Sequence, residues 1–247
     1  MKAQFDATGS VIAITGAANG IGRALALACA KAGAKVIALD VDDREGEALQ
    51  SEHAHIEYRH LDVADRAAVS RVFADVLMRH GQIDGLVLGA AIQPRIPVQD
   101  TPADTWQHVL DVNLNGVVWC YQAVLPSMIA RRAGSVIAFS SGLASSGWLG
   151  ASAYATTKAA LTAFVKSAAK EVAAHRVRFN LIAPGVIDTP QYRRANEGND
   201  GAHWQQTLGV GAADDVVGPL MFLLSDAASM TASLVSRDFA YASRDDA

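Results

Sequence analysis

The stretch Val-Ile-Ala-Ile-Thr-Gly-Ala-Ala-Asn-Gly-Ile-Gly, from Val11 to Gly22, leads from an apolar run through glycines into a helical pattern. The run from Val11 to Ile14 is apolar on both faces, which is typical of a strand buried on both sides of a parallel sheet. Glycines after such a strand allow a tight turn and let the backbone approach a pyrophosphate, which the N–H groups at the helix start can bind. An ordinary glycine turn is the alternative, because this pattern alone is a weak signal.

Outward from this stretch, short β-branched runs alternate with longer helical patterns. The order predicts a Rossmann-type, doubly wound α/β fold, with about seven parallel strands, helices on both faces and a single domain over 1–247. Strands are expected at 11–15, 35–39, 56–61, 85–88, 135–140, 178–182 and 234–239. The main helices are expected at 20–32, 43–51, 66–80, 102–130, 153–174 and 214–224. The long irregular stretch at about 184–210 is expected to form a substrate lid.

The composition of the 247 residues excludes several classes of protein. Hydrophobic residues make up 51% of the chain, enough for a full core, and the net charge of -4 without a Lys/Arg run argues against nucleic-acid binding. Met1 to Gly9 lacks the pattern of a signal peptide, and no apolar run is long enough to span a membrane. Cys29 and Cys120 are interpreted as small core residues in a reducing compartment, so we expect a cytoplasmic protein; no metal site is predicted.

An acid follows the glycine stretch at a spacing typical of a dinucleotide site. Asp40 ends the second predicted strand, 18 residues after Gly22, where its carboxylate can accept both ribose hydroxyls of NAD and would repel a 2′-phosphate. Asp62 and Val63 follow the third strand and could contact the adenine, although a plain helix N-cap explains Asp62 equally well. The cofactor predicted from these residues is NAD.

A second group of residues carries acid–base chemistry. Tyr154 and Lys158 are four residues apart and therefore share one face of a predicted helix. A free phenol, with a pKa of about 10, is a poor base at neutral pH, and a nearby ammonium would lower that pKa. Ser141 ends the fifth predicted strand, where its hydroxyl could hold a substrate oxygen beside Tyr154. Tyr-x-x-x-Lys alone is common on surface helices, but its combination with Ser141 and the glycine stretch favours an active site.

On these motifs the chain resembles the classical short-chain dehydrogenases/reductases over nearly its whole length. The resemblance implies hydride transfer between NAD(H) and a secondary alcohol or ketone, with Tyr154 as proton acceptor. It also implies that Lys158 lowers the Tyr154 pKa and holds the nicotinamide ribose, that Ser141 orients the substrate oxygen, and that Asn113 supports a water chain. Together with the residue patterns it gives these candidate cofactor contacts: Gly16, Asn19, Gly20, Ile21, Gly22, Asp40, Asp62, Val63, Ala90, Tyr154, Lys158, Pro184, Gly185, Ile187 and Thr189.

The chain departs from the family pattern at two places. Gly89 stands where the family usually has an Asn that braces the sheet, so no role carries over to it. Arg237 and Asp238 stand where the family has a compact glycine-rich turn at a subunit contact. The resemblance implies a homotetramer, with a dimer as the alternative, in which the helices at 106–130 and 153–174 pair. Their expected interface anchors are Trp119, Tyr121 and Phe164.

The sequence specifies the substrate less closely than it specifies the cofactor and the catalytic residues. The candidate pocket residues are Gln93, Arg95, Ser141, Trp148, Tyr154, Tyr192 and Trp204, with Arg193 and Arg194 expected as solvated lid charges. They suit a secondary alcohol or ketone that is cyclic, sugar-derived or carboxylated. Arg95 could bind an anionic group, but the sequence favours a solvent-facing side chain. Two alternatives stay open: an enzyme using bound NAD for epimerisation or dehydration, and a non-catalytic dinucleotide-binding protein.

Overall fold

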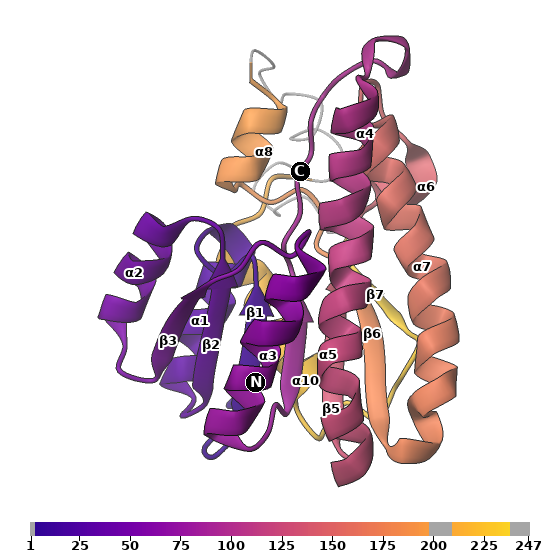
Figure 1. Ribbon diagram of the computed structural model, residues 1–247. Coiled ribbons are helices and arrows are strands. Elements are labelled where there is room, and N and C mark those ends of the chain that lie inside the picture. Colours follow the sequence, from indigo (N-terminus) through magenta and orange to yellow (C-terminus); the bar gives the residue numbers. More distant parts are fainter. Residues whose placement is uncertain (1–2, 198–208, 238–247) are drawn as a thin grey trace, which may run out of the picture.

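Seven parallel strands lie side by side in the order β3-β2-β1-β4-β5-β6-β7 in the computed structural model, which describes residues 3–197 and 209–237 (Figure 1). The strands are β1 (Val11–Thr15), β2 (Lys35–Asp40), β3 (Ile56–His60), β4 (Gly85–Leu88), β5 (Gly134–Phe139), β6 (Val177–Ala183) and β7 (Leu234–Ser236). From β1 the chain moves outward to β3, then returns to β4 and moves the other way. The predicted doubly wound fold is confirmed, and its switch point lies between β1 and β4, where open α/β sheets bind their ligands.

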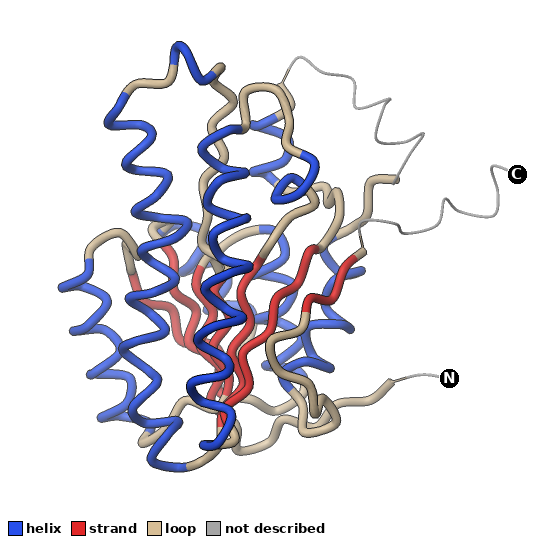
Figure 2. Tube along the Cα trace, turned by 90° about the vertical axis from the view of Figure 1, so that its right-hand side faces the viewer, coloured by secondary structure: helices blue, strands red, loops and turns tan. Residues whose placement is uncertain are grey.

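Helices cover both faces of the sheet (Figure 2). One face carries α3 (Arg66–His80), α5 (Gly116–Arg131) and α7 (Ser152–Val172), and the other carries α1 (Gly20–Lys31), α2 (Asp43–Glu52) and α10 (Val217–Leu224). Each face therefore has its own apolar core. Within the described residues, no helix combines the length and the apolar character needed to cross a membrane.

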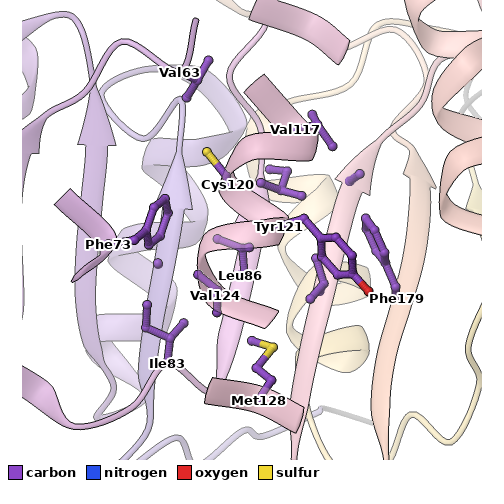
Figure 3. Packing of buried hydrophobic residues seen from close by; sticks show 14 of the residues in the cluster. Val63, Phe73, Ile83, Leu86, Val117, Cys120, Tyr121, Val124, Met128 and Phe179 are labelled. Carbon is purple, nitrogen blue, oxygen red and sulfur yellow. The ribbon is translucent and has the colours of Figure 1, made fainter. Parts of the chain in front are cut away.

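Aromatic stacking organises the core on the α5 face (Figure 3). Tyr121 of α5 is only 4% exposed, and its ring stacks on Phe179 of β6 with ring centroids 4.7 Å apart. The expectation that Tyr121 anchors a subunit interface is therefore wrong, because this side chain fills the core of its own chain. Cys29 and Cys120 are both free and buried, as predicted.

Three predicted elements differ from the structure. The helix expected at 102–130 is α4 (Ala103–Leu110) and α5 joined by a π-helical turn over Asp111–Asn115, which adds one residue to the hydrogen-bonded ring. The stretch expected to be irregular contains the helix α8 (Pro190–Ala195). The strand expected to reach 239 ends at Ser236. Trp204, Asp238 and Phe239 lie outside the described residues.

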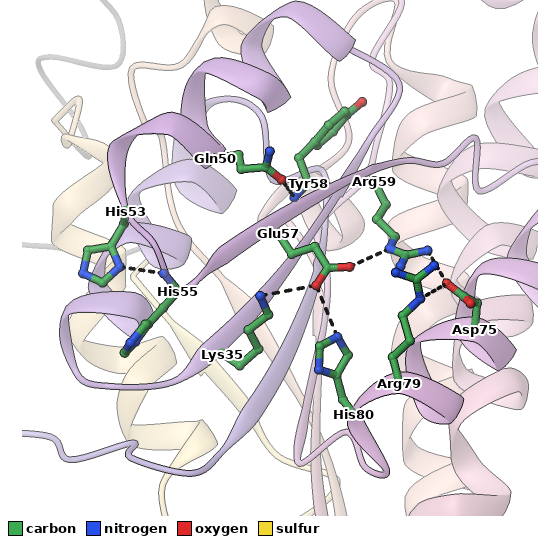
Figure 4. A network of polar contacts seen from close by, with 10 residues as sticks. All are labelled: Lys35, Gln50, His53, His55, Glu57, Tyr58, Arg59, Asp75, Arg79 and His80. Carbon is green, nitrogen blue, oxygen red and sulfur yellow. Dashed lines mark hydrogen bonds and ion pairs between the residues drawn. The ribbon is translucent and has the colours of Figure 1, made fainter.

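A network of charged side chains joins the outer strand β3 to α3 (Figure 4). Glu57 accepts from Arg59 at 2.9 Å and pairs with Lys35 at 3.3 Å, and Arg59 also pairs with Asp75 of α3. Partial burial raises the pKa of Glu57, but the hydrogen bonds and positive charges of Arg59 and Lys35 outweigh it, so the pKa lies below its usual value. The network therefore ties the outer strand β3 to β2 and to α3.

Candidate active site

The glycine turn after β1 leaves the start of α1 open. Gly16 has φ +70°, in the left-handed region that favours glycine, and a Cβ on Gly22 would lie 2.1 Å from the Gly16 carbonyl oxygen. The Asn19 side chain does not cap α1; its amide donates to Asp42 at 3.3 Å instead. The first turn of α1 contains no acidic residue. The N–H groups and the positive end of the helix dipole are thus available to an anion.

Backbone N–H groups fix the Asp40 carboxylate at the end of β2. One oxygen accepts from Ala18 N at 2.9 Å, and the other accepts from Val41 N at 2.8 Å and Asp42 N at 3.1 Å. An ionised carboxylate accepts hydrogen bonds and cannot donate them, so it suits ribose hydroxyls and repels phosphate. This end of the cleft is lined by Asp40, Val41, Asp42, Leu61, Asp62 and Val63, none of which is basic.

Asp62 belongs to the wall of the cleft and does not cap the following helix. Its carboxylate accepts from Ala64 N at 2.9 Å within its own turn, whereas Asp65 caps α3 by accepting from Ala67 N and Ala68 N. The N-cap interpretation of Asp62 is therefore wrong. Val63 beside it packs against Gly116 of α5, where a Cβ would approach the Val63 side chain to 2.7 Å.

Tyr154 and Lys158 lie buried on one face of α7, 8% and 3% exposed respectively. The Lys158 ammonium lies 5.5 Å from the centroid of the Tyr154 ring and donates to the Phe139 carbonyl oxygen at 2.8 Å. Burial lowers the pKa of Lys158 to about 8, because it disfavours the charged form. The ammonium is therefore held between the end of β5 and the phenol.

Burial also dominates the pKa of Tyr154, which it raises to about 12. A hydrogen bond with Ser141 and the positive charge of Arg95 act in the opposite direction without outweighing burial. The net lowering expected from the sequence is thus not found, because removing the phenolate from water costs more than these contacts return. Ser141 is itself fixed at the start of α6 (Leu143–Ser146), where its hydroxyl accepts from Leu143 N at 3.2 Å.

Asn113 lies in the π-helical turn, fully buried behind the wall of the cleft. Its side-chain oxygen accepts from Ile92 N at 2.8 Å, and its amide donates to Ile92 O at 2.9 Å and to the Thr157 hydroxyl at 3.3 Å. The side chain thereby joins the loop after β4 to α7. Sequence reasoning missed Thr157 and Ile92; Thr157 could have been noticed because it lies between Tyr154 and Lys158.

The glycine at position 89 is accommodated by its neighbours. Gly89 N and Ala90 N donate to the Thr15 hydroxyl at 3.1 and 3.3 Å, so that β1 braces the loop after β4 without an amide side chain. A Cβ on Gly89 would lie 2.8 Å from the Thr15 carbonyl oxygen. In place of the Asn side chain that the family usually has here, the backbone of the loop after β4 approaches Thr15 of β1 directly.

The stretch after β6 closes the other side of the cleft. Thr189 caps α8 by accepting from Tyr192 N at 3.1 Å, and its methyl group would lie 3.0 Å from a Cβ on Gly20. The glycine turn and the start of the expected lid therefore meet. Arg237 donates to Pro184 O at 3.2 Å and pairs with Asp215 at 3.7 Å, so its charge is compensated within the same chain.

A cleft of about 1110 Å³ opens at the carboxyl end of the sheet, and residues of α6 and α8 are among those that line it. All the predicted cofactor contacts line it, together with Gln93, Arg95, Trp148 and Tyr192. Trp204 is not among the described residues. The Arg193 side chain is 70% exposed and pairs with Asp188, as expected of a solvated lid charge. Arg194 is exposed on the same helix and lines the cleft.

Arg95 departs from the sequence expectation. Its side chain is half-buried in the wall of the cleft, with Nη1 donating to Leu149 O and Nη2 to the Asn196 side-chain oxygen, both at 3.3 Å. The solvent-facing interpretation is therefore wrong, because two segments distant in sequence cover this guanidinium.

Comparisons with known proteins agree with the fold described above. The family model of the short chain dehydrogenases matches residues 10–200. A 3-oxoacyl-[acyl-carrier-protein] reductase of Thermotoga maritima is 36% identical over 227 residues, covering 90% of this chain and 92% of the relative. A 2-keto-3-deoxy-L-fuconate dehydrogenase of Xanthomonas campestris pv. campestris is 37% identical over 229 residues, covering 88% and 75%. A solved structure assigned as an NAD(P) dependent gluconate 5-dehydrogenase from Beutenbergia cavernae, with NADP bound at low occupancy, gives a TM-score of 0.88 at 30% identity, covering 96% and 98%.

Proposed function

This chain belongs to the short-chain dehydrogenase family, and we propose that it transfers a hydride reversibly between NAD(H) and a secondary alcohol or ketone. The observation that supports this most directly is the meeting of Ser141, Tyr154 and Lys158 in the wall of the cleft that begins at the glycine turn. A proton donor, a hydroxyl and a cation thus lie at the carboxyl end of the sheet, beside the place where a dinucleotide fits.

The residues that line the cleft suit the parts of a nicotinamide dinucleotide. The glycine turn and the start of α1 would hold the pyrophosphate, and Asp40 would accept from the adenosine ribose. Asp62 and Val63 would contact the adenine, Lys158 the nicotinamide ribose, and Ile187 and Thr189 the carboxamide. When bound, the cofactor supplies the hydride donor or acceptor.

The carboxylates at the adenosine end support NAD over NADP. Asp40 and Asp42 both line this part of the cleft, and Asn19 donates to Asp42, so the glycine turn itself presents no cation here. A 2′-phosphate would meet negative charge without a compensating side chain among the six residues that line this end. One structural relative carries NADP, so the choice between NAD and NADP has to be measured on this chain.

The proton chemistry follows from the burial of Tyr154. With its pKa raised to about 12, the phenol holds its proton at neutral pH and can donate it to the oxygen of a carbonyl group that becomes an alcohol. The Ser141 hydroxyl would hold the same oxygen, and the Lys158 ammonium would stabilise the phenolate that remains. In the oxidative direction the phenolate takes the alcohol proton back. Asn113 would keep the loop after β4 and α7 in register, and its support of a water chain remains a prediction.

The substrate class proposed is a small carbonyl compound or secondary alcohol. The names of the two sequence relatives refer to an oxoacyl group and a keto sugar acid, and both therefore describe chemistry at a carbonyl carbon. The stretch from 184 to 210, with α8 at its start, would act as the lid over that substrate.

The test is a panel of secondary alcohols with NAD and of ketones with NADH, followed by NADH absorbance. Tyr154→Phe keeps the ring but removes the proton donor, so turnover should fall by roughly 10²–10⁴-fold while NADH still binds. Wild-type kcat/KM should be higher with NAD than with NADP, and Asp40→Ala should narrow that difference. Near wild-type turnover by Tyr154→Phe, or a preference of the wild type for NADP, would contradict the proposal in its mechanism or in its cofactor.

A further inference from the structure

We propose that Arg95 binds a carboxylate of the substrate, so that the preferred substrates are small oxo acids in reduction and hydroxy acids in oxidation. This inference rests on the proposed function, because it places the reacting carbon at Tyr154 and adds a second point of attachment in the same cleft. Its basis is the position, the partners and the remaining donors of one half-buried guanidinium.

The backbone on both sides of Arg95 is held in place. Asn113 exchanges two hydrogen bonds with the backbone of Ile92, at 2.8 and 2.9 Å, and Ile96 N donates to Gly150 O at 2.9 Å. The segment between these anchors therefore runs between the buried π-helical turn and the loop that precedes α7. A side chain on so short an anchored segment has a defined direction, and that of Arg95 lines the cleft.

The charge of Arg95 has no carboxylate partner in the part of the chain that the structure describes. Its two partners, Leu149 O and the Asn196 side-chain oxygen, are neutral acceptors at 3.3 Å, and its buried Nε has no acceptor among the described residues. Arg131, which is also partly buried, pairs by contrast with Asp84 at 2.8 Å. Burying a cation without an anion is costly, so an anion entering the cleft would gain from meeting this charge.

The donors that remain on Arg95 match a carboxylate. A guanidinium has five N–H donors in one plane, and two of them are used by Leu149 and Asn196. Because Nε is buried, the donors left for a ligand are one N–H on each terminal nitrogen, and two terminal N–H groups can form a two-pronged contact with a carboxylate. Arg95 lines the same cleft as Tyr154 and Tyr192, and its positive charge acts on both phenols. One small molecule can therefore span Arg95 and Tyr154.

The experiment compares acids with their neutral amides. 2-Oxobutanoate, acetoacetate and levulinate, each beside its primary amide, are reduced with NADH by the wild type, Arg95→Gln, Arg95→Lys and Arg193→Gln. The best acid should exceed its amide in kcat/KM by roughly 10- to 100-fold, the size expected for charge-assisted hydrogen bonds. Arg95→Gln should abolish this preference, and Arg95→Lys should restore part of it. Arg193→Gln removes an exposed charge from α8 and should leave the acid-to-amide ratio unchanged.

A binding measurement separates the anion contact from the chemistry. The thermal unfolding temperature of the NADH complex of Tyr154→Phe should rise with the best acid and not with its amide, and Arg95→Gln in the same background should remove the rise. Equal kcat/KM or equal binding for acids and amides, in a protein whose turnover depends on Tyr154, would overturn the carboxylate site alone. Turnover that does not depend on Tyr154 would instead contradict the proposed function. If none of the six compounds is reduced, absence of acid-specific binding overturns the inference.

Discussion

Burial acts on the two titratable groups of the site in opposite directions. It raises the pKa of the Tyr154 phenol to about 12 and lowers that of the Lys158 ammonium to about 8. At neutral pH both groups therefore carry their protons, which is the state needed to reduce a carbonyl. Oxidation needs the phenolate, whose fraction grows tenfold per pH unit below the Tyr154 pKa.

The pH dependence of the two directions should consequently differ. For a neutral secondary alcohol, log kcat/KM of oxidation should rise with a slope near one from about pH 6 and level off towards about pH 8, where Lys158 is half deprotonated. For the corresponding ketone, kcat/KM of reduction should change little over that range, because Tyr154 stays protonated. Steady-state rates in both directions on one alcohol–ketone pair give the comparison. An oxidation rate that does not vary with pH would show that Tyr154 is not the proton acceptor.

At the scale of residues, the sequence predicts which side chains share a helix face, but it does not predict contacts between residues far apart in the chain. Tyr154 and Lys158 share a face because they lie four apart on one helix, and the sequence alone gives that. The surroundings of Arg95 depend on Leu149 and Asn196, which are 54 and 101 residues away along the chain. No pattern around Arg95 carries this information, so its side chain was expected in solvent. The burial that raises the Tyr154 pKa is likewise a property of the whole cleft.

At the scale of elements, the glycine turn depends on one close approach. α1 can follow β1 so tightly because Gly22 has no side chain where a Cβ would lie 2.1 Å from the Gly16 carbonyl oxygen. Gly22→Ala should therefore shift α1 away from β1, lower the free energy of unfolding by about 1–3 kcal/mol and weaken NADH binding. Thermal unfolding and a fluorescence titration with NADH measure the two effects.

A matched substitution exists in a second helix. Gly218 is exposed in α10, and an added Cβ would meet nothing within 4 Å. Gly218→Ala should leave NADH binding unchanged and raise the free energy of unfolding by about 0.4–1 kcal/mol, because it restricts only the unfolded chain. If Gly22→Ala bound NADH as tightly as Gly218→Ala does, the close approach at the turn would not matter for the cofactor.

Some element boundaries follow from sequence patterns, and others leave no trace in the sequence. The helices around the switch point follow from apolar periodicity, and the strands follow from short continuous apolar runs, because each of these strands is buried on both faces. The π-helical turn over Asp111–Asn115 could not be predicted, since one extra residue in a turn leaves the apolar pattern continuous. The start of α8 could have been: Thr189 followed by Pro190 is an N-cap followed by a favoured first helical residue.

At the scale of the whole molecule, the surroundings of Tyr121, Trp119 and Arg237 bear on assembly. Tyr121 belongs to the core and cannot anchor a partner, whereas Trp119 is half-buried beneath the Arg66 guanidinium at 4.5 Å. Arg237, which stands where the family has a subunit contact, pairs with Asp215 in its own chain. Arg237 therefore brings no uncompensated charge to that contact.

We accordingly propose that the homotetramer forms, with α5 and α7 pairing across one two-fold axis. Ala159 and Ala163 are exposed and one turn apart on α7, and small side chains there would allow two helices to approach closely. Ala163→Arg adds a long charged side chain to this surface without touching the core. Light scattering at micromolar concentration should give the mass of four chains for the wild type and a smaller mass for Ala163→Arg. Ala74→Arg, on an exposed site of α3, should leave the mass unchanged. A wild-type dimer would mean that the contact around β7 fails, and a wild-type monomer would refute the helix pairing itself.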